Sequence, residues 1–221
     1  MHVKNFAIVF LIIGLFGIVF CHDFSVAEDV QTAEENTPAD LPDKYVKPSI
    51  DKESVEKEAD AYFDAGIENS DKNTKEAYLS KALEKYMLLL KFYPNNAIYA
   101  AQIGVIHDNL GHPYVAKEYL TRAINLEYLN PFANFYFGEY YFNKRDYLNA
   151  LKYYKVAYNN GYQKLYQVNI KLATVYEKLG DISKAKFHYN LSGKQNPSIE
   201  GIDSKIKSLD KVYYSKSSYK M

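Results

Sequence analysis

The sequence has a single cysteine, no tryptophan and only two arginines among its 221 residues. A lone cysteine, Cys21, cannot form a disulfide within the chain. Arginine is the residue that makes bidentate contacts to phosphates and bases, so Arg122 and Arg145 alone argue against a nucleic-acid-binding protein. Lysine plus arginine and aspartate plus glutamate both number 27, so the net charge is zero.

Motifs for catalysis and for metal or cofactor binding are also missing. The five histidines show no metal-ligand spacing such as His-x3-His beside a carboxylate. The sequence contains no glycine-rich phosphate loop and no Gly-x-Ser-x-Gly motif. The chain is therefore predicted not to be an enzyme and to need no cofactor.

An apolar run, FAIVFLIIGLFGIVFC, extends from Phe6 to Cys21 and follows Lys4. Its 16 residues suit the core of a signal peptide and fall short of the roughly 20 residues that span a bilayer comfortably. Ser25-Val26-Ala27 places small residues at a cleavage site. Residues 1–27 are predicted to be an export signal, with an uncleaved anchor formed by residues 6–21 as the alternative.

Cys21 ends the apolar run and so raises a further alternative, lipoprotein processing. Lipoprotein signals resemble Leu-x-small-Cys, whereas Phe20 fills the small position here. The protein is expected to be exported across the membrane, to the periplasm if the signal is bacterial. Its contact with the membrane is expected only through this N-terminal segment.

Residues 28–51 read EDVQTAEENTPADLPDKYVKPSID, with three prolines, several acids and no apolar periodicity. Such a segment cannot bury enough apolar surface to offset the entropy of ordering it. We interpret it as a flexible linker.

Beyond the linker, small and large residues recur with one period. The steps are 34 and then 35 residues in three separate columns: Gly104, Gly138, Ala173; Ala116, Ala150, Ala185; Leu120, Tyr154, Tyr189. Small residues allow two helices to approach closely, and the larger residues fill the ridges beside that contact. The pattern predicts helical hairpins that stack to share one core.

These columns resemble the tetratricopeptide repeat pattern W-x2-L-G-x2-Y, then A-x3-F, then P. Three copies begin Ala100…Ile103-Gly104, Asn134…Phe137-Gly138 and Asn169…Leu172-Ala173, and a weaker copy has Ala82, Tyr86 and Pro94. The tryptophan column is absent. The resemblance implies an all-α solenoid of three clear repeats plus one degenerate repeat, closed by an amphipathic capping helix. The predicted boundaries are 52–96, 97–130, 131–165, 166–199, 200–214 for the cap and 215–221 for a flexible tail.

Members of that family usually hold ligands along a groove lined by one face of each first helix. Carried onto this sequence, the resemblance implies thirteen groove residues: Gln102, Val105, Asn109, Phe132, Phe135, Tyr136, Glu139, Phe142, Asn143, Ile170, Lys171, Thr174 and Lys178. Lys171 and Lys178 lie on one helix face, where they form either a cationic end to the groove or a solvated pair.

The segment PFANFYFGEYYFNKRD, residues 131–146, has more aromatic residues than one helix needs to face a core. A helix that is apolar all round is either buried or meets a partner. We therefore expect an exported or membrane-tethered scaffold that binds another protein or peptide segment through an aromatic groove. Two alternatives remain: a glycan- or peptidoglycan-binding module, and a homo-oligomer that buries the aromatic face between copies.

Overall fold

The computed structural model describes the backbone of residues 49–218 and the side chains as far as Lys211. This part of the chain is helical throughout, without a strand, which confirms the predicted all-α fold class. The predicted signal or anchor, Cys21 and nearly all of the linker lie outside the described residues. None of the described helices has the length and apolarity of a membrane span.

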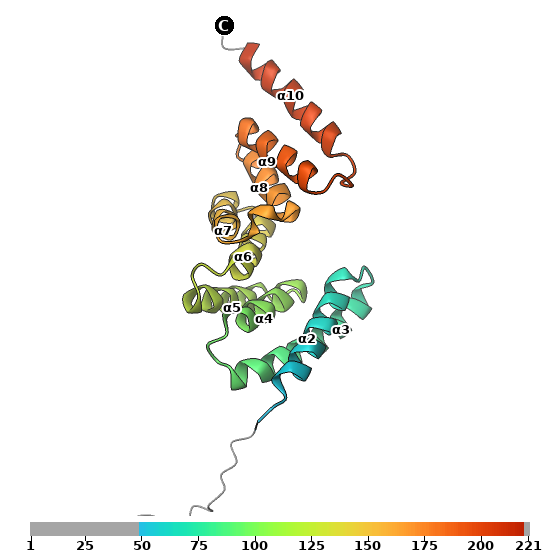
Figure 1. Cartoon of the computed structure of the whole chain (residues 1–221), viewed down its shortest axis with the longest axis vertical. Coiled ribbons are helices and arrows are strands. Elements are labelled where there is room, and N and C mark those ends of the chain that lie inside the picture. Colours follow the sequence, from blue (N-terminus) through green and yellow to red (C-terminus); the bar gives the residue numbers. More distant parts are fainter. Residues whose placement is uncertain (1–48, 219–221) are drawn as a thin grey trace, which may run out of the picture. The chain divides into compact units, whose positions relative to one another are not determined.

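Four helical hairpins follow one another along the chain (Figure 1). They pair α2 (Lys52–Glu68) with α3 (Lys72–Phe92), α4 (Ala97–Asn109) with α5 (Pro113–Leu126), α6 (Pro131–Asn143) with α7 (Tyr147–Asn159), and α8 (Tyr166–Lys178) with α9 (Ile182–Gln195). A short 3-10 turn, η1 (Tyr162–Lys164), precedes α8, and α10 (Ile202–Ser218) follows the last hairpin.

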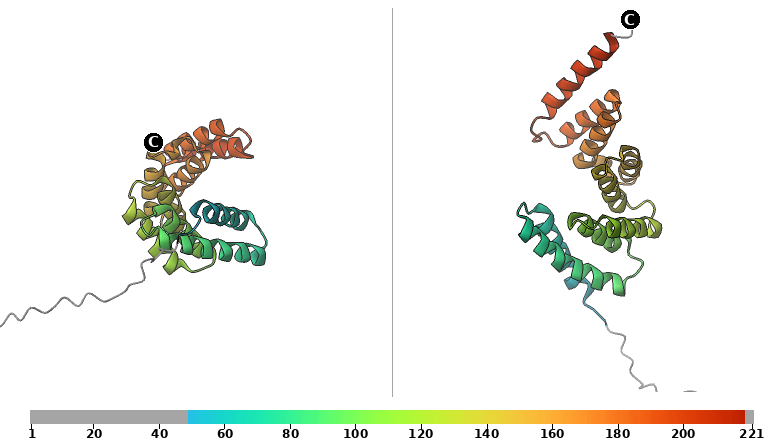
Figure 2. Two further views of the ribbon diagram at one scale, coloured as in Figure 1. Left: turned by 60° about the horizontal axis from the view of Figure 1, so that its bottom comes forward. Right: turned by 180° about the vertical axis from the view of Figure 1, so that it is seen from behind.

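Each hairpin packs against the next one in sequence. The second helix of one hairpin contacts the first helix of the following hairpin, α4 also contacts α6, and α10 packs against α9. The further views of the ribbon show the same succession of hairpins (Figure 2). A core shared between neighbours in this way is the predicted solenoid arrangement.

Polar residues mark where the helices begin. The side chains of Asp71, Asn96, Asn130, Asp146 and Asp181 each accept a hydrogen bond from a backbone N–H in the first turn of the helix that follows. These caps satisfy amide groups that have no partner inside the helix. Two helices, α5 and α6, have proline in the first turn, where its missing N–H costs nothing.

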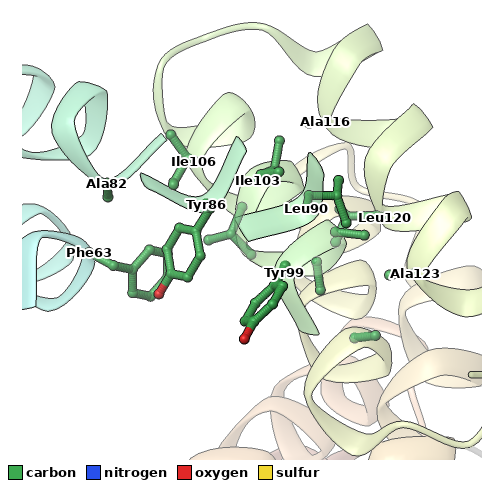
Figure 3. Close-up of a cluster of buried hydrophobic side chains, with 14 of the residues drawn as sticks. Phe63, Ala82, Tyr86, Leu90, Tyr99, Ile103, Ile106, Ala116, Leu120 and Ala123 are labelled. Atoms are coloured by element: carbon green, nitrogen blue, oxygen red, sulfur yellow. The ribbon is translucent and has the colours of Figure 1, made fainter. Parts of the chain in front are cut away.

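The two helices of a hairpin approach each other most closely at the small residues of the predicted columns. A Cβ atom added to Gly104 would lie 2.8 Å from Leu120 Cγ, and one added to Gly138 would lie 2.5 Å from Tyr154 Cδ1. Ala116 and Ala150 on the facing helices are completely buried. Figure 3 shows Ala116 and Leu120 of α5 among the buried side chains of the first three hairpins' shared core. The two backbones therefore approach too closely for a larger residue.

In the third and fourth hairpins, a buried asparagine occupies the position where the family pattern has tryptophan. These two asparagines link neighbouring repeats. Asn134 Nδ2 donates to the carbonyl oxygens of Tyr128 and Asn130, and Asn169 Nδ2 makes the same kind of bond to Gln163. Through these hydrogen bonds, each side-chain amide fixes the loop that precedes the first helix of its own hairpin. Asn134 Oδ1 has no hydrogen-bond partner among residues 49–211, although the residue is fully buried.

The capping helix packs as its spacing predicts. Ile202 and Leu209 of α10 are buried, and Lys186 of α9 forms an ion pair with Asp210. The helix continues to Ser218, beyond the predicted end at residue 214. Helix α10 therefore packs on the side of the last hairpin that has no following repeat.

Residues in left-handed conformation turn the chain inside three hairpins. Gly111 has φ 80° and Gly180 has φ 82°, and Arg145 takes the equivalent place in the α6–α7 turn with φ 60°. Glycine adopts this conformation without steric cost, whereas a residue with a Cβ atom pays roughly 1–2 kcal/mol.

We expect Arg145→Gly to stabilise the protein by about 0.5–1 kcal/mol, because relief of the left-handed conformation exceeds the entropy that glycine adds to the unfolded chain. Arg145→Ala is the matched control, since it removes the same side chain and keeps the Cβ atom. Urea unfolding followed by circular dichroism measures both. Equal midpoints for the two variants would contradict a steric cause.

Protonation of His188 should weaken the fold. His188 Nδ1 lies 2.9 Å from Asn169 Oδ1, and the ring stacks on Tyr176 with centroids 5.6 Å apart. Burial lowers the pKa of His188, so the folded state favours the neutral ring, whose Nδ1–H can donate to the amide oxygen. Its contribution to stability is complete above the unfolded pKa of about 6.5 and is lost as pH falls towards the lower folded value.

We therefore predict that the free energy of unfolding declines as the pH falls below about 6.5, and that it declines less steeply in His188→Gln. Glutamine keeps an amide donor for Asn169 and does not titrate. Chemical denaturation at several pH values gives the two slopes, and parallel slopes would exclude His188 as the source.

Candidate functional site

A pocket of about 270 Å³ opens between the first helices of the third and fourth hairpins. Its lining comes from α6, from the connection that contains η1, and from α8: Phe132, Phe135, Tyr136, Tyr162, Leu165, Gln167 and Val168. Three of these, Phe132, Phe135 and Tyr136, are among the thirteen predicted groove residues. We refer to this cavity as the aromatic pocket.

Four rings form the wall of the aromatic pocket. The centroids of Phe132 and Tyr136 are 4.6 Å apart, those of Phe135 and Tyr136 are 5.3 Å apart, and those of Phe135 and Tyr162 are 6.2 Å apart. Phe135 also contacts Tyr154 of α7 at 5.8 Å, which ties the wall to the core. All four pocket rings are only partly buried. Tilted and edge-on contacts of this kind hold aromatic rings in fixed orientations.

Two other rings of α6, those of Phe137 and Tyr141, pack against α7. Phe137 is buried, with its centroid 4.6 Å from that of Tyr153, and Tyr141 stacks on Tyr153 at 5.5 Å and 5°. The abundance of aromatics in α6 therefore has two causes. One set fills the core against α7, and the other lines the pocket.

A carboxylate of α6 links three helices beside the pocket. Glu139 Oε1 accepts a hydrogen bond from the hydroxyl of Tyr154 in α7, and Glu139 Oε2 forms an ion pair with Lys171 of α8 at 2.6 Å. Burial and the charge of Glu139 raise the pKa of Tyr154, which therefore remains a hydroxyl donor. Glu139 and Lys171 thus neutralise each other's charge.

The same link between a core tyrosine and the first helix recurs in other hairpins. Tyr86 donates to Asp60 in the first hairpin, and Tyr189 donates to Glu177 in the fourth. Glu177 also pairs with Lys205 of α10, as Glu139 does with Lys171. In the second hairpin the corresponding pair is apolar, with Leu120 and Val105 both buried. Where the second helix of a hairpin has a tyrosine at this place, the first helix supplies an acid that accepts its hydrogen bond. In the second hairpin, where the tyrosine is replaced by leucine, the first helix has a valine instead of an acid.

The second hairpin offers less surface to a partner than was predicted. Gln102 and Val105 are buried, with 8% and 4% of their surfaces exposed. Asn109 is exposed, and its Nδ2 donates to the carbonyl oxygen of Val105. The burial arises because α4 contacts α6 as well as α5 and α3.

The other predicted groove residues remain partly or fully accessible. Phe142 packs edge-on against Tyr147 and carries the ammonium of Lys171 over its ring at 5.5 Å. Asn143 is exposed and donates to Asp108 at 3.4 Å. Thr174 bonds to the carbonyl oxygen of Ile170, which is itself half-buried, and Lys178 is exposed. These residues do not line the aromatic pocket.

Four lining residues are not among the thirteen predicted groove residues: Tyr162, Leu165, Gln167 and Val168. Tyr162 and Leu165 belong to the connection between hairpins, a region whose sequence predicts a turn rather than a binding surface. Tyr162 occupies the column in which the resemblance places a closing proline, and that replacement was the available signal. Gly161, with φ 130°, starts this connection.

An acidic row runs along α2. Glu56, Asp60, Asp64 and Glu68 are spaced by four residues and so lie on one side of the helix. Burial, and then the charges of Asp60 and Glu68, raise the pKa of Asp64. Asp64 also contributes to the raised pKa of Tyr136, which is caused first by burial.

No group of three or more histidine, cysteine, aspartate or glutamate side chains in the described part of the chain is arranged to hold a metal ion.

Comparison with known proteins identifies the repeats. A family profile described as tetratricopeptide repeat matches residues 99–128 and 166–198. The chain contains tetratricopeptide repeats. It is 33% identical over 119 residues to the TPR repeat-containing protein MJ1428 of Methanocaldococcus jannaschii, an alignment that covers 54% of this chain and 21% of that protein. The chain thus spans about a fifth of this relative's length.

Solved structures share the fold. PilF of Pseudomonas aeruginosa superimposes with a TM-score of 0.55 and 19% identity, covering 74% of this chain and 72% of that one. The first TPR of Spaghetti (RPAP3), bound to the HSP90 peptide SRMEEVD, gives a TM-score of 0.50 and 13% identity, covering 54% and 94%. These similarities establish the architecture of a tetratricopeptide repeat solenoid.

A double-mutant cycle, in which Tyr154 and Glu139 are replaced by the leucine and valine of the second hairpin, should show that the two residues contribute to stability cooperatively. Tyr154→Leu removes the hydroxyl from Glu139, and Glu139→Val leaves the Tyr154 hydroxyl and Lys171 without their partner. We expect each change to cost about 1–3 kcal/mol. The double variant should be destabilised by about 1 kcal/mol less than the sum. Urea unfolding of all four proteins completes the cycle, and strict additivity would contradict the coupling.

Proposed function

We propose that this protein is a scaffold that binds a peptide segment of another protein, with the aromatic pocket as the anchor point. The observation that carries the proposal is the cluster of four partly exposed rings on and beside α6. Pockets that bind ligands are concave and mainly apolar, with a few polar groups for orientation, and Gln167 and the two tyrosine hydroxyls provide such groups here.

The repeat architecture supports a protein or peptide as the partner. Tetratricopeptide repeats are typical of protein–protein interaction scaffolds, and proteins built from them are generally not catalytic. One structural neighbour, the first TPR of Spaghetti, was solved with a peptide bound. Aromatic side chains are also the residues that dominate binding energy at protein interfaces. An aromatic anchor point beside a first helix suits the same mode of binding here.

Export is a second part of the proposal. Its support is the apolar run of residues 6–21 and the small residues before position 28, which suit an export signal or an anchor. The linker of residues 28–51 would then separate the scaffold from the membrane if the signal is retained.

Site-specific photo-crosslinking in the native host tests the partner-binding proposal. We expect a benzophenone side chain placed at position 135 to crosslink a protein, and one at position 148 to crosslink nothing. Leu148 is the matched control, because it is an apolar residue with 72% of its surface exposed on α7 and lies away from the pocket lining. Adducts at position 135 that contain only this chain would favour the homo-oligomer, and adducts to polysaccharide would favour the glycan module.

The captured partner then permits a quantitative test. Phe135→Ala should weaken its binding on the order of 10- to 100-fold, as expected for the loss of an aromatic anchor, while Leu148→Ala should leave binding unchanged. Phe135 also contacts Tyr154, so circular dichroism at the assay temperature must show that the variant is folded. Equal affinities for a folded Phe135→Ala variant and the parent protein would reject the aromatic pocket as the anchor point.

A further inference from the structure

Two histidines meet at the turn of the second hairpin. His107 lies in the last turn of α4, and His112 is the residue directly before α5. Their Nδ1 atoms are 3.4 Å apart and their ring centroids are 5.6 Å apart. His107 is half-buried and His112 is exposed, so solvent reaches the pair. The spacing of five residues matches no common metal-ligand motif, but the turn between the helices brings the two imidazoles together.

The backbone of the turn fixes where both histidines stand. The N–H of His112 donates to the carbonyl oxygen of His107 at 2.8 Å, and Gly111 between them has φ 80°. This is the hydrogen bond of a Schellman motif, a common way in which a helix ends at glycine. The ring of His107 also stacks on that of Tyr119 in α5, with centroids 5.9 Å apart and planes 21° apart. At least one of the imidazoles is therefore oriented before any ligand binds.

Neither histidine follows the pattern of the other hairpins. His107 stands where the next two hairpins have Tyr141 and Tyr176. The residue directly before the second helix is an aspartate in the first, third and fourth hairpins, and each aspartate caps its helix: Asp71, Asp146 and Asp181. The side chain of His112 makes no such bond to α5. The second hairpin thus gives up a helix cap at the place where its second imidazole stands.

We propose that His107 and His112 bind a divalent metal ion of the zinc, copper or nickel type through their Nδ1 atoms, with water at the remaining positions. Imidazole nitrogen is a preferred ligand of these ions. A tetrahedral ion with metal–nitrogen bonds of about 2.0–2.1 Å holds two ligand nitrogens about 3.3–3.4 Å apart. The separation of 3.4 Å between the two Nδ1 atoms agrees with that value. The site shares no residue with the aromatic pocket and does not depend on the proposed function.

A hydrogen bond is the other way in which two imidazoles can share this space. One Nδ1–H would then donate to the other Nδ1, but hydrogen bonds from N–H to oxygen are commonest at about 2.9–3.0 Å. The bond between His188 Nδ1 and Asn169 Oδ1 has such a length, 2.9 Å, whereas the separation of the histidine pair is longer. A metal ion takes the place of the shared proton and uses the lone pairs of both neutral rings.

The site would join the end of α4 to the start of α5. Because two side chains of the described part supply ligands and water fills the other positions, the ion should exchange readily. It differs in this respect from structural zinc, which is held in closed sites of four protein ligands.

Zinc titration of the complete protein with isotope-labelled histidine tests the site. The protein is first treated with a chelator, and the ring resonances are followed by NMR, which distinguishes the pair from the histidines at positions 2, 22 and 188. We expect the rings of His107 and His112 to shift together and to saturate with one zinc ion, while magnesium at the same concentration shifts neither. Zinc that shifts only other histidines, or only one ring of the pair, would overturn the two-histidine site.

Two variants and a matched control identify the ligands. His107→Tyr introduces the residue of the third and fourth hairpins, and His112→Asn introduces an uncharged helix cap. Each leaves one imidazole of the pair, so zinc affinity should fall about tenfold or more, a loss that even outer-shell partners of metal ligands cause. His188→Gln is the control, because it removes an imidazole that is paired with Asn169, and it should leave zinc binding unchanged. Equal zinc affinity in the parent protein and both variants would reject the site.

Urea unfolding separates the loss of a ligand from a loss of structure. Without zinc, His112→Asn should unfold at a urea concentration no lower than that of the parent, because asparagine caps α5. Zinc should raise the midpoint of the parent more than that of either variant, because a ligand that binds only the folded state stabilises it. A zinc-dependent rise of the same size in all three proteins would place the ion elsewhere on the chain and contradict the assignment.

Discussion

The close approach of the two helices within each hairpin is the constraint on which the rest of this structure depends. Because Gly138 has no side chain, the ring of Tyr154 can lie directly across α6. Its hydroxyl then reaches Glu139, on the same helix as the pocket rings. The contact that builds the core therefore also fixes which polar groups stand beside the pocket, and the same arrangement joins Tyr86 to Asp60 in the first hairpin. Core packing and surface chemistry are coupled at each of these points.

Much of the fold could be predicted from the sequence, because small residues at a regular period have one structural cause. Gly104 and Gly138 stand where a Cβ atom would collide with the facing helix, as their columns implied. Gly111 and Gly180 turn the chain, but the equivalent turn uses Arg145, which no rule of residue preference selects. The asparagines in the tryptophan column likewise link neighbouring repeats. That role depends on the positions of the loop carbonyl oxygens, which the sequence does not give.

The candidate site could be predicted only in part. A helical period tells which residues share a face, and Phe132, Phe135 and Tyr136, which the resemblance placed in one groove, do line one pocket. It does not tell what covers that face. Val105 is buried because a neighbouring first helix packs against α4, and Lys171 is paired because Glu139 stands one repeat earlier. Both facts depend on contacts between residues about 30 positions apart, which periodicity within one helix does not contain.

The pocket's walls come from two different repeats and from the connection between them, with Tyr136 on one side, Tyr162 in the connection and Val168 on the other. In a solenoid, each repeat is held mainly by its immediate neighbours, so small rotations at such a junction are the softest motions available to the chain. A ligand that touches both sides would restrain that junction. Occupancy would then stiffen the junction between the third and fourth hairpins.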